Sequence, residues 1–132
     1  MFYKKQKQGE KWYPRTITVG TYDTKEVADR LSRISTVSRS DTYAVLIGLG
    51  EVLGEMMESG NSVKLEGLGT FFLVGKANKH GVDTAEEVTP NQFQKLTVGF
   101  IPEYRRASNH QVTRMSLVPQ QVQWIEIEDA VK

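Results

Sequence analysis

Residues from about Ser38 to Glu58 form a predicted helix whose apolar side chains surround most of its circumference. Ser38 and Asp41 have the spacing of a capping pair at its start, and Gly60 is placed to end it. The apolar positions are Ala44, Leu46, Ile47, Leu49, Val52, Leu53, Met56 and Met57. A helix that is apolar on nearly all sides must be buried on more than one side. One side can pack within the chain, and the other needs a surface that the monomer does not supply.

The same helix contains three glycines, Gly48, Gly50 and Gly54. Each costs about 1 kcal/mol relative to alanine in a helix. They are either tolerated imperfections or positions where a second helix crosses closely, because a missing side chain lets two backbones approach. We favour the second interpretation, a dimer in which this helix, with Leu49 and Leu53, forms part of the contact.

A shorter helix precedes this one. Asp23 or Thr24 is a plausible N-cap, because Glu26 follows Asp23 at capping-box spacing. Val27, Leu31 and Ile34 then repeat at helical spacing, which predicts a helix of about twelve residues with one apolar stripe. Before it, the alternating residues 16–19 predict a short strand that Gly20 ends.

After Ser62 the apolar period changes from 3.6 to 2, which indicates strands. The first strand runs through Val63 and Leu65 and reaches Gly67-Leu68-Gly69, and residues 71–74 continue it. A polar segment, 75–94, separates it from a strand over 95–101, where Pro102 can open a short helix. Residues 123–128 alternate again and predict an added strand. Two helices followed by antiparallel strands predict an α+β fold.

The glycines of the Gly67-Leu68-Gly69 stretch call for an explanation, because glycine weakens a strand interior. We interpret them as a corner that lets one strand bend while Leu68 stays buried and Phe71 resumes the pleat. On this interpretation the glycines give the sheet a sharp bend. The alternative is an ordinary bulge in an unrelated α+β protein.

The composition excludes several classes of protein. The chain of 132 residues has no cysteine and only two isolated histidines, so it offers no disulfide and no evident metal site. No apolar run approaches 18 residues and no signal peptide is evident, which predicts a cytoplasmic protein without a membrane span. The motifs of phosphate-binding loops and dinucleotide sites are missing. We therefore expect no enzyme activity, no catalytic residues and no cofactor.

The charge is concentrated at the N-terminus. The net charge is only +1, yet residues 1–22 carry five basic side chains against the single acid Glu10. These basic residues are interleaved with aromatic ones, Phe2, Tyr3, Trp12 and Tyr13, a composition that suits contact with a nucleic-acid backbone. The alternative is an edge strand that lengthens the sheet and buries the aromatic rings.

The stretch from Glu58 to Phe71, with Gly60 after a helix and Gly67-Leu68-Gly69-Thr70-Phe71 after a strand, resembles the bacterial histone-like HU and integration-host-factor family. Phe100-Ile101-Pro102 resembles the run that closes the last strand of that family. The resemblance covers residues 24–106 and implies a helical hairpin packed under a curved antiparallel sheet, with a protruding β-arm, in an intertwined homodimer. We expect a basic N-terminal extension over 1–22 that adds a strand, an HU-like domain over 23–106 and a C-terminal extension over 107–132. Such extensions are similar to those of a divergent, Bacteroidetes-type branch.

In that family two β-arms embrace DNA, and a proline at each tip wedges between base steps. Here Lys76 and Lys79 fall on basic arm positions. The tip does not match the family, because Val82-Asp83-Thr84 and the acids Glu86 and Glu87 stand where a basic motif is expected. Pro90 lies several residues further on. Carboxylates at the tip would repel phosphates, so either the DNA-binding surface lies elsewhere, or binding is weak, or the fold serves another purpose.

The resemblance and the charge distribution give a set of candidate residues. Those expected to contact DNA are Lys76, Lys79, Lys95, Arg105, Arg106, Lys4, Lys5, Lys7, Lys11 and Arg15. Those expected to form the saddle and dimer are Gly67, Leu68, Gly69, Phe71, Leu49 and Leu53. For Arg105 and Arg106 the alternative is that they cap the short helix after Pro102.

The sequence thus predicts a non-catalytic homodimer that binds, and in doing so bends, double-stranded DNA with little sequence preference in the nucleoid. The alternative is a protein-interaction module that keeps the HU-like dimer but has lost DNA binding. In that case the extensions and the acidic hairpin would bind a protein partner.

Overall fold

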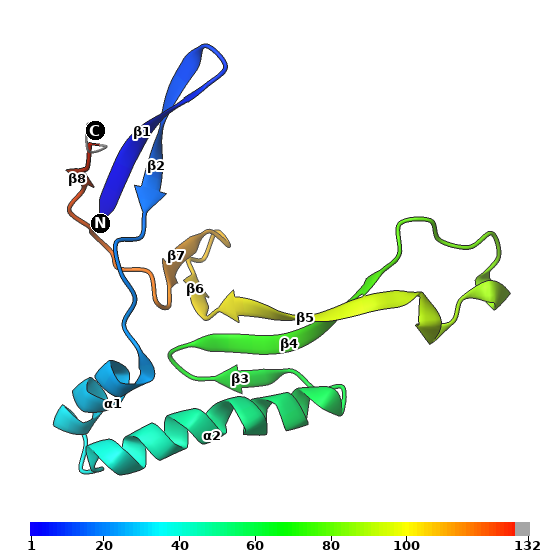
Figure 1. The fold of residues 1–132 in the computed structure, drawn as a ribbon, viewed down its shortest axis with the longest axis horizontal. Coiled ribbons are helices and arrows are strands. Elements are labelled where there is room, and N and C mark those ends of the chain that lie inside the picture. The colour runs from blue at the N-terminus through cyan, green and yellow to red at the C-terminus, as the bar shows by residue number, and fades with distance from the viewer. Residues whose placement is uncertain (129–132) are drawn as a thin grey trace. The chain divides into compact units, whose positions relative to one another are not determined.

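The computed structural model describes residues 1–128, which contain two α-helices, two short 3-10 turns and eight strands (Figure 1). The α+β class predicted from the sequence is confirmed. The chain divides into two compact units, one made of Met1–Ala44 with the chain from Pro119 onward, the other of Val45–Val118. The last four residues of the predicted C-terminal extension, 129–132, lie outside the described residues.

The first unit contains a three-stranded sheet in the order β2-β1-β8. β1 (Phe2–Gln8) and β2 (Lys11–Ile17) form an antiparallel hairpin, and β8 (Ile125–Glu126) pairs with β1 in parallel. The predicted C-terminal strand is therefore present. The hairpin was only partly anticipated, since its lysine-rich first strand has no apolar alternation. The strand that pairs with this hairpin is β8. The expected addition of the hairpin to the main antiparallel sheet is therefore not observed.

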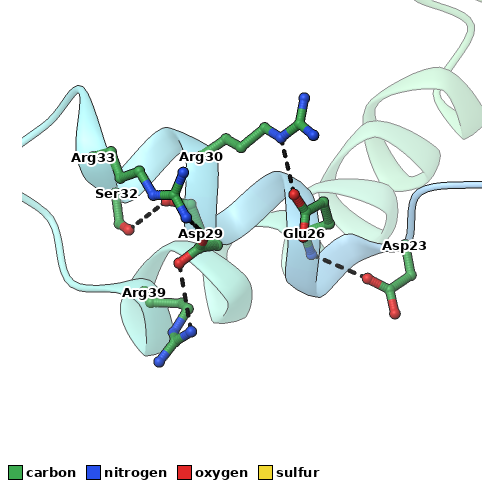
Figure 2. Close-up of polar contacts among 7 residues, drawn as sticks. All are labelled: Asp23, Glu26, Asp29, Arg30, Ser32, Arg33 and Arg39. Carbon is green, nitrogen blue, oxygen red and sulfur yellow. Dashed lines mark hydrogen bonds and ion pairs between the residues drawn. The ribbon is translucent and has the colours of Figure 1, made fainter.

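The two helices begin where the sequence predicts. α1 (Thr24–Arg33) has Asp23 as its N-cap, and the Asp23 carboxylate accepts a hydrogen bond from the Glu26 amide at 3.0 Å (Figure 2). α2 (Arg39–Glu58) begins after Ser38, whose hydroxyl accepts from the Asp41 amide at 3.1 Å. Gly60 ends α2 with φ of +93°, a left-handed conformation that favours glycine.

The second unit contains an antiparallel sheet in the order β3-β4-β5. β3 (Val63–Leu65) and β4 (Gly69–Ala77) are neighbours, with Leu65 opposite Gly69, so residues 66–68 form a tight reverse turn. The expected bend within one continuous strand is therefore wrong, because the two glycines lie where the chain reverses between two strands. Leu68, at the turn, is 38% exposed in the chain and is not buried.

β4 and β5 (Phe93–Pro102) form a long two-stranded ribbon that ends in a loop with two 3-10 turns, η1 (Ala85–Glu87) and η2 (Pro90–Gln92) (Figure 1). The rings of Phe71 and Phe100 are tilted against each other across the ribbon's base, with centroids 4.8 Å apart. After Pro102 the chain forms a second hairpin from β6 (Tyr104–Arg106) and β7 (Val112–Met115). The expected short helix after Pro102 is wrong.

Very little of this chain is buried. Among residues 1–128, Ala28 and Met57 are the only buried apolar residues. On α2, Val45, Val52 and Met56 lie along one exposed stripe, while Leu46, Leu53 and Met57 lie along a less accessible one. On β5, Leu96 and Val98 are more than 60% exposed. Such a distribution leaves large apolar surfaces open on a single chain.

Candidate functional site

A pair of basic residues lies across the β4–β5 ribbon. Lys76 on β4 is directly opposite Lys95 on β5, so their side chains leave the same face of the ribbon, and both are exposed. Lys79 follows β4 by two residues and is exposed as well. The sequence named all three as candidates, and the register brings the first two together. This face of the ribbon therefore carries concentrated positive charge.

Beyond these lysines, residues 80–92 of the loop have a different chemistry. They carry Asp83, Glu86 and Glu87, and a hollow of about 400 Å³ is lined mainly by Val82, Val88 and Phe93 with their neighbours. Pro90 opens η2, and the side chain of Gln92 accepts a hydrogen bond from the Thr89 amide at 2.9 Å. Pro90 thus has a local structural role. The tip is acidic and apolar rather than basic.

The β6–β7 hairpin carries a second cluster of basic residues. Arg105 is directly opposite Arg114, and Arg106 is opposite Val112. The guanidinium of Arg106 lies 4.7 Å from the ring centroid of Tyr104 and donates to the carbonyl of His110 at 2.8 Å. The alternative in which Arg105 and Arg106 cap a helix is wrong, because both lie in the strand β6.

The hairpin is attached at its base to the turn between β3 and β4. A carboxylate oxygen of Glu103 accepts from the Gly67 amide at 2.7 Å, and the Glu103 amide donates to the Leu68 carbonyl at 3.0 Å. The Ser116 amide donates to the Glu103 carbonyl at 2.6 Å. The Ser116 hydroxyl donates to the Leu68 carbonyl. The glycine-containing turn thus holds the arginine-bearing hairpin in place.

The N-terminal hairpin distributes its basic residues over two faces. Lys4 is opposite Arg15, which puts both on one face, whereas Lys5 and Lys7 lie on the other. Lys5 forms an ion pair with Glu126 at 3.2 Å, and Lys7 lies 6.0 Å from the ring centroid of Trp12. Lys11 opens β2 opposite Gln8. The five candidate residues of this segment therefore do not form one surface.

Contacts on the second face of the hairpin have an electrostatic consequence. The hydrogen bond from Lys5 to Glu126 raises the pKa of the Lys5 ammonium above its usual value, and the attraction of the carboxylate acts in the same direction. The aromatic rings are not uniformly covered. Trp12 is 65% exposed, while the ring of Tyr3 meets Trp124 edge-on at 6.3 Å. The alternative in which all these rings are buried is wrong for Trp12 and for Tyr13, which is 47% exposed.

The three arginines of the helices are paired with carboxylates. Asp29 accepts from Arg33 and from Arg39, and Glu26 accepts from Arg30 at 3.0 Å (Figure 2). The cavity of about 530 Å³ between the start of α1 and the start of α2 is lined by several of these charged residues and by Tyr43. Because their charges are balanced locally, these arginines are weaker candidates for a phosphate than those of the β6–β7 hairpin.

Arg114 is not among the residues that the sequence predicts to contact DNA, although a signal for it exists. Residues 104–125 contain three arginines and no aspartate or glutamate. The net charge of the C-terminal segment as a whole does not reveal this basic stretch, because the acids of the segment all follow residue 125. Only the strand register shows that Arg114 faces Arg105.

The described residues contain neither a metal-binding group nor a membrane-spanning helix. Within residues 1–128 no group of three or more histidine, aspartate or glutamate side chains is placed to hold a metal ion. Neither α1 nor α2 is long and apolar enough to cross a bilayer.

Comparisons with known proteins place this geometry in context. The family model described as "HU domain fused to wHTH, Ig, or Glycine-rich motif" matches residues 2–116. A solved structure titled "Putative bacterial DNA binding protein", from Bacteroides vulgatus, aligns with a TM-score of 0.53 at 18% identity, over 76% of this chain and 41% of that one. HU from Anabaena in a cocrystal with DNA aligns with a TM-score of 0.45 at 21% identity, over 60% of this chain and 86% of that one. No curated protein sequence matches the chain.

Proposed function

The chain belongs to the family of HU domains fused to wHTH, Ig or glycine-rich motifs, and we propose that it is a non-catalytic, architectural protein that binds duplex DNA as a homodimer. The observation that carries the proposal is the Lys76–Lys95 pair on the β4–β5 ribbon of an HU-like fold. Two exposed ammonium groups on one face of a ribbon suit contact with backbone phosphates. Such contacts carry no base code, so we expect little sequence preference. The expected location is the nucleoid.

The homodimer is supported by the exposed apolar surface of the chain. Val52 and Met56 on α2 and Leu96 and Val98 on β5 would be left in water by an isolated monomer. Burying an aliphatic side chain of this size contributes about 1.5–3 kcal/mol. A chain that buries so few apolar residues by itself has little to offset the entropy of folding. A second copy is the proposed source of the missing core.

We propose that the three segments expected from the sequence have separate roles. The domain over 23–106 forms the dimer and the DNA-binding ribbon. The extension over 1–22 adds phosphate contacts through Lys4 and Arg15, the pair that shares one face of its hairpin. The C-terminal extension completes the β6–β7 hairpin and supplies the strand β8.

The proposal is tested by titrating a labelled duplex at salt concentrations from about 50 to 200 mM, over which phosphate-driven affinity falls steeply. The wild-type protein should bind with a linear dependence of log K on log salt. Replacing Lys76 and Lys95 by glutamine should make the slope less steep, by about 0.9 for each phosphate that is no longer neutralised. Lys25→Gln, which removes the same kind of charge from α1, is the matched control and should leave the slope unchanged.

A protein-interaction role is the second candidate, and the acidic, apolar loop between β4 and β5 favours it. Asp83, Glu86 and Glu87 cannot neutralise phosphate, and Val88 and Phe93 are about 60% exposed beside them. If the wild-type protein fails to bind the duplex at the lowest salt concentration, DNA binding is excluded and this second role is favoured. If it binds and the loop acids can be replaced without effect, the loop is not part of the DNA interface.

A further inference from the structure

Two arginines face each other across the β6–β7 hairpin. Arg105 and Arg114 are directly opposite in the antiparallel register. Opposite residues leave the same face of a sheet with Cβ atoms about 5 Å apart, and like charges in such a pair are destabilising. Arginine cannot relieve the repulsion by losing its proton. The pair therefore has an energetic cost that an anion between the two guanidinium groups would remove.

The chain itself does not provide that anion. Residues 104–125 contain no acid, and within residues 1–128 neither guanidinium takes part in an ion pair. Arg106 differs, because its guanidinium stacks on Tyr104 and donates to His110. The acid nearest in sequence is Glu103, and one of its carboxylate oxygens already accepts from the Gly67 amide. Arg105 and Arg114 are thus left with unused donors.

The surroundings of the pair form a shallow site. Arg105, Arg114, Ser116, Gly67 and Glu103 line part of a groove of about 350 Å³. The hydrogen bonds from Glu103 and Ser116 to the β3–β4 turn fix the base of the hairpin. Because the strands are already ordered, less conformational entropy is lost when an anion binds here than when it binds to a flexible loop.

We propose that the Arg105–Arg114 pair binds a backbone phosphate of duplex DNA, as a contact separate from that of Lys76 and Lys95. Guanidinium groups present planar donors that match the oxygens of a phosphate. The inference rests on the proposed function, since it assigns a further contact to the same DNA. It also gives the β3–β4 turn a role in holding a phosphate-binding element.

The test compares the wild-type protein with the double variant Arg105→Gln/Arg114→Gln in duplex titrations across the same salt range. In a dimer the variant lacks two equivalent phosphate-binding pairs, so the slope of log K against log salt should become less steep, by about 1.8. Affinity at the lowest salt concentration should fall at least tenfold. Arg114→Lys, made alone, should retain part of the affinity, because it keeps the charge but not the planar donors. Lys25→Gln, which removes one positive charge from α1, again serves as the surface-charge control.

Thermal unfolding without DNA separates binding from a structural role. If the arginines served only to hold the hairpin together, the double variant would unfold at a lower temperature. The proposal expects an unfolding temperature equal to or above that of the wild type, because the repulsion has been removed. A lower value, with an unchanged salt slope, overturns it.

The outcomes also separate this inference from the function on which it rests. If the wild-type protein does not bind duplex DNA, the proposed function itself fails. If the wild type binds and the double variant keeps the same slope and affinity, the function stands and this inference is overturned. Inorganic phosphate at millimolar concentration is a third probe. If it stabilises the wild type but not the variant while the DNA slope is equal in both, the pair is a site for free phosphate and the DNA assignment is overturned.

Discussion

Gly69 lies so close to β5 that a Cβ atom there would come within 2.2 Å of the Ile101 carbonyl oxygen and within 2.8 Å of the Phe100 ring. Its φ of +158° is also one that residues with side chains rarely adopt. Gly69→Ala should therefore destabilise the protein by about 3 kcal/mol or more, because backbone must move as well as a ring. Urea unfolding at a fixed protein concentration measures the change.

Gly20→Ala is the matched control for this prediction, since a Cβ there meets nothing within 4 Å. It should change stability by much less than Gly69→Ala. Equal effects from the two substitutions would mean that the close approach of Gly69 to β5 does not determine stability.

Much of the fold could be predicted because its signals are local. The capping residues Asp23 and Ser38 fix where the helices begin, and Gly60 fixes where α2 ends. The role of the Gly67–Gly69 stretch could not be predicted in the same way, because a bend within a strand and a turn between two strands need the same residues. Which of them forms depends on the pairing of Leu65 with Gly69, a tertiary property.

The dimer proposal makes a specific prediction for Gly48. On α2 this residue lies on the side of the helix that carries the exposed residues Val45, Val52 and Met56, whereas Gly54 lies away from that stripe. Within the chain, a Cβ atom added at either position would meet nothing within 4 Å outside the backbone of the helix itself. If a second copy crosses at the stripe, Gly48→Ala should weaken the dimer, and Gly54→Ala should stabilise the helix by up to about 1 kcal/mol.

Sedimentation over a range of protein concentrations measures both variants. A shift of the Gly48→Ala dimer toward monomer or unfolded chain at micromolar concentration supports the crossing. Stabilisation by both substitutions would exclude a close approach of backbones at Gly48. A wild-type protein that sediments as a folded monomer would exclude the homodimer itself.

The N-cap of α1 gives a further prediction. Asp23→Ala removes the acceptor for the Glu26 amide and should cost about 1 kcal/mol of stability. Asp23→Asn keeps a capping oxygen and should cost much less. The two variants are compared by their midpoints of urea unfolding, and equal losses would show that the capping hydrogen bond is not the cause.

The Lys5–Glu126 pair predicts a change at high pH. Because the pKa of Lys5 is raised above 10.5 in the folded chain, the pair stabilises the contact between β1 and β8 in full below pH 10.5. This contribution disappears as the pH rises through the higher, folded-state pKa. In Trp12→Phe protein, the fluorescence of Trp124 should therefore change above pH 10.5. Adding Glu126→Gln should abolish this change in fluorescence. A change that persists in the double variant would show that the Lys5–Glu126 pair is not its cause.

The candidate site was predictable only in part. Lys76, Lys95, Arg105 and Arg106 could be identified from their charge and their place along the chain. Their grouping depends on register, which pairs Lys76 with Lys95 and brings Arg114 opposite Arg105. Register also divides the N-terminal lysines between two faces, a separation that a count of charges cannot detect.

The attachment of the β6–β7 hairpin uses Glu103, Ser116 and main-chain atoms of the β3–β4 turn, and it uses none of the three arginine side chains. The three arginine side chains can therefore be exchanged without removing the contacts that attach the hairpin. Substitutions of these arginines are expected to change the affinity for the proposed DNA ligand while the attachment of the hairpin is retained. An engineer could in the same way graft a different recognition ribbon between Glu103 and Ser116.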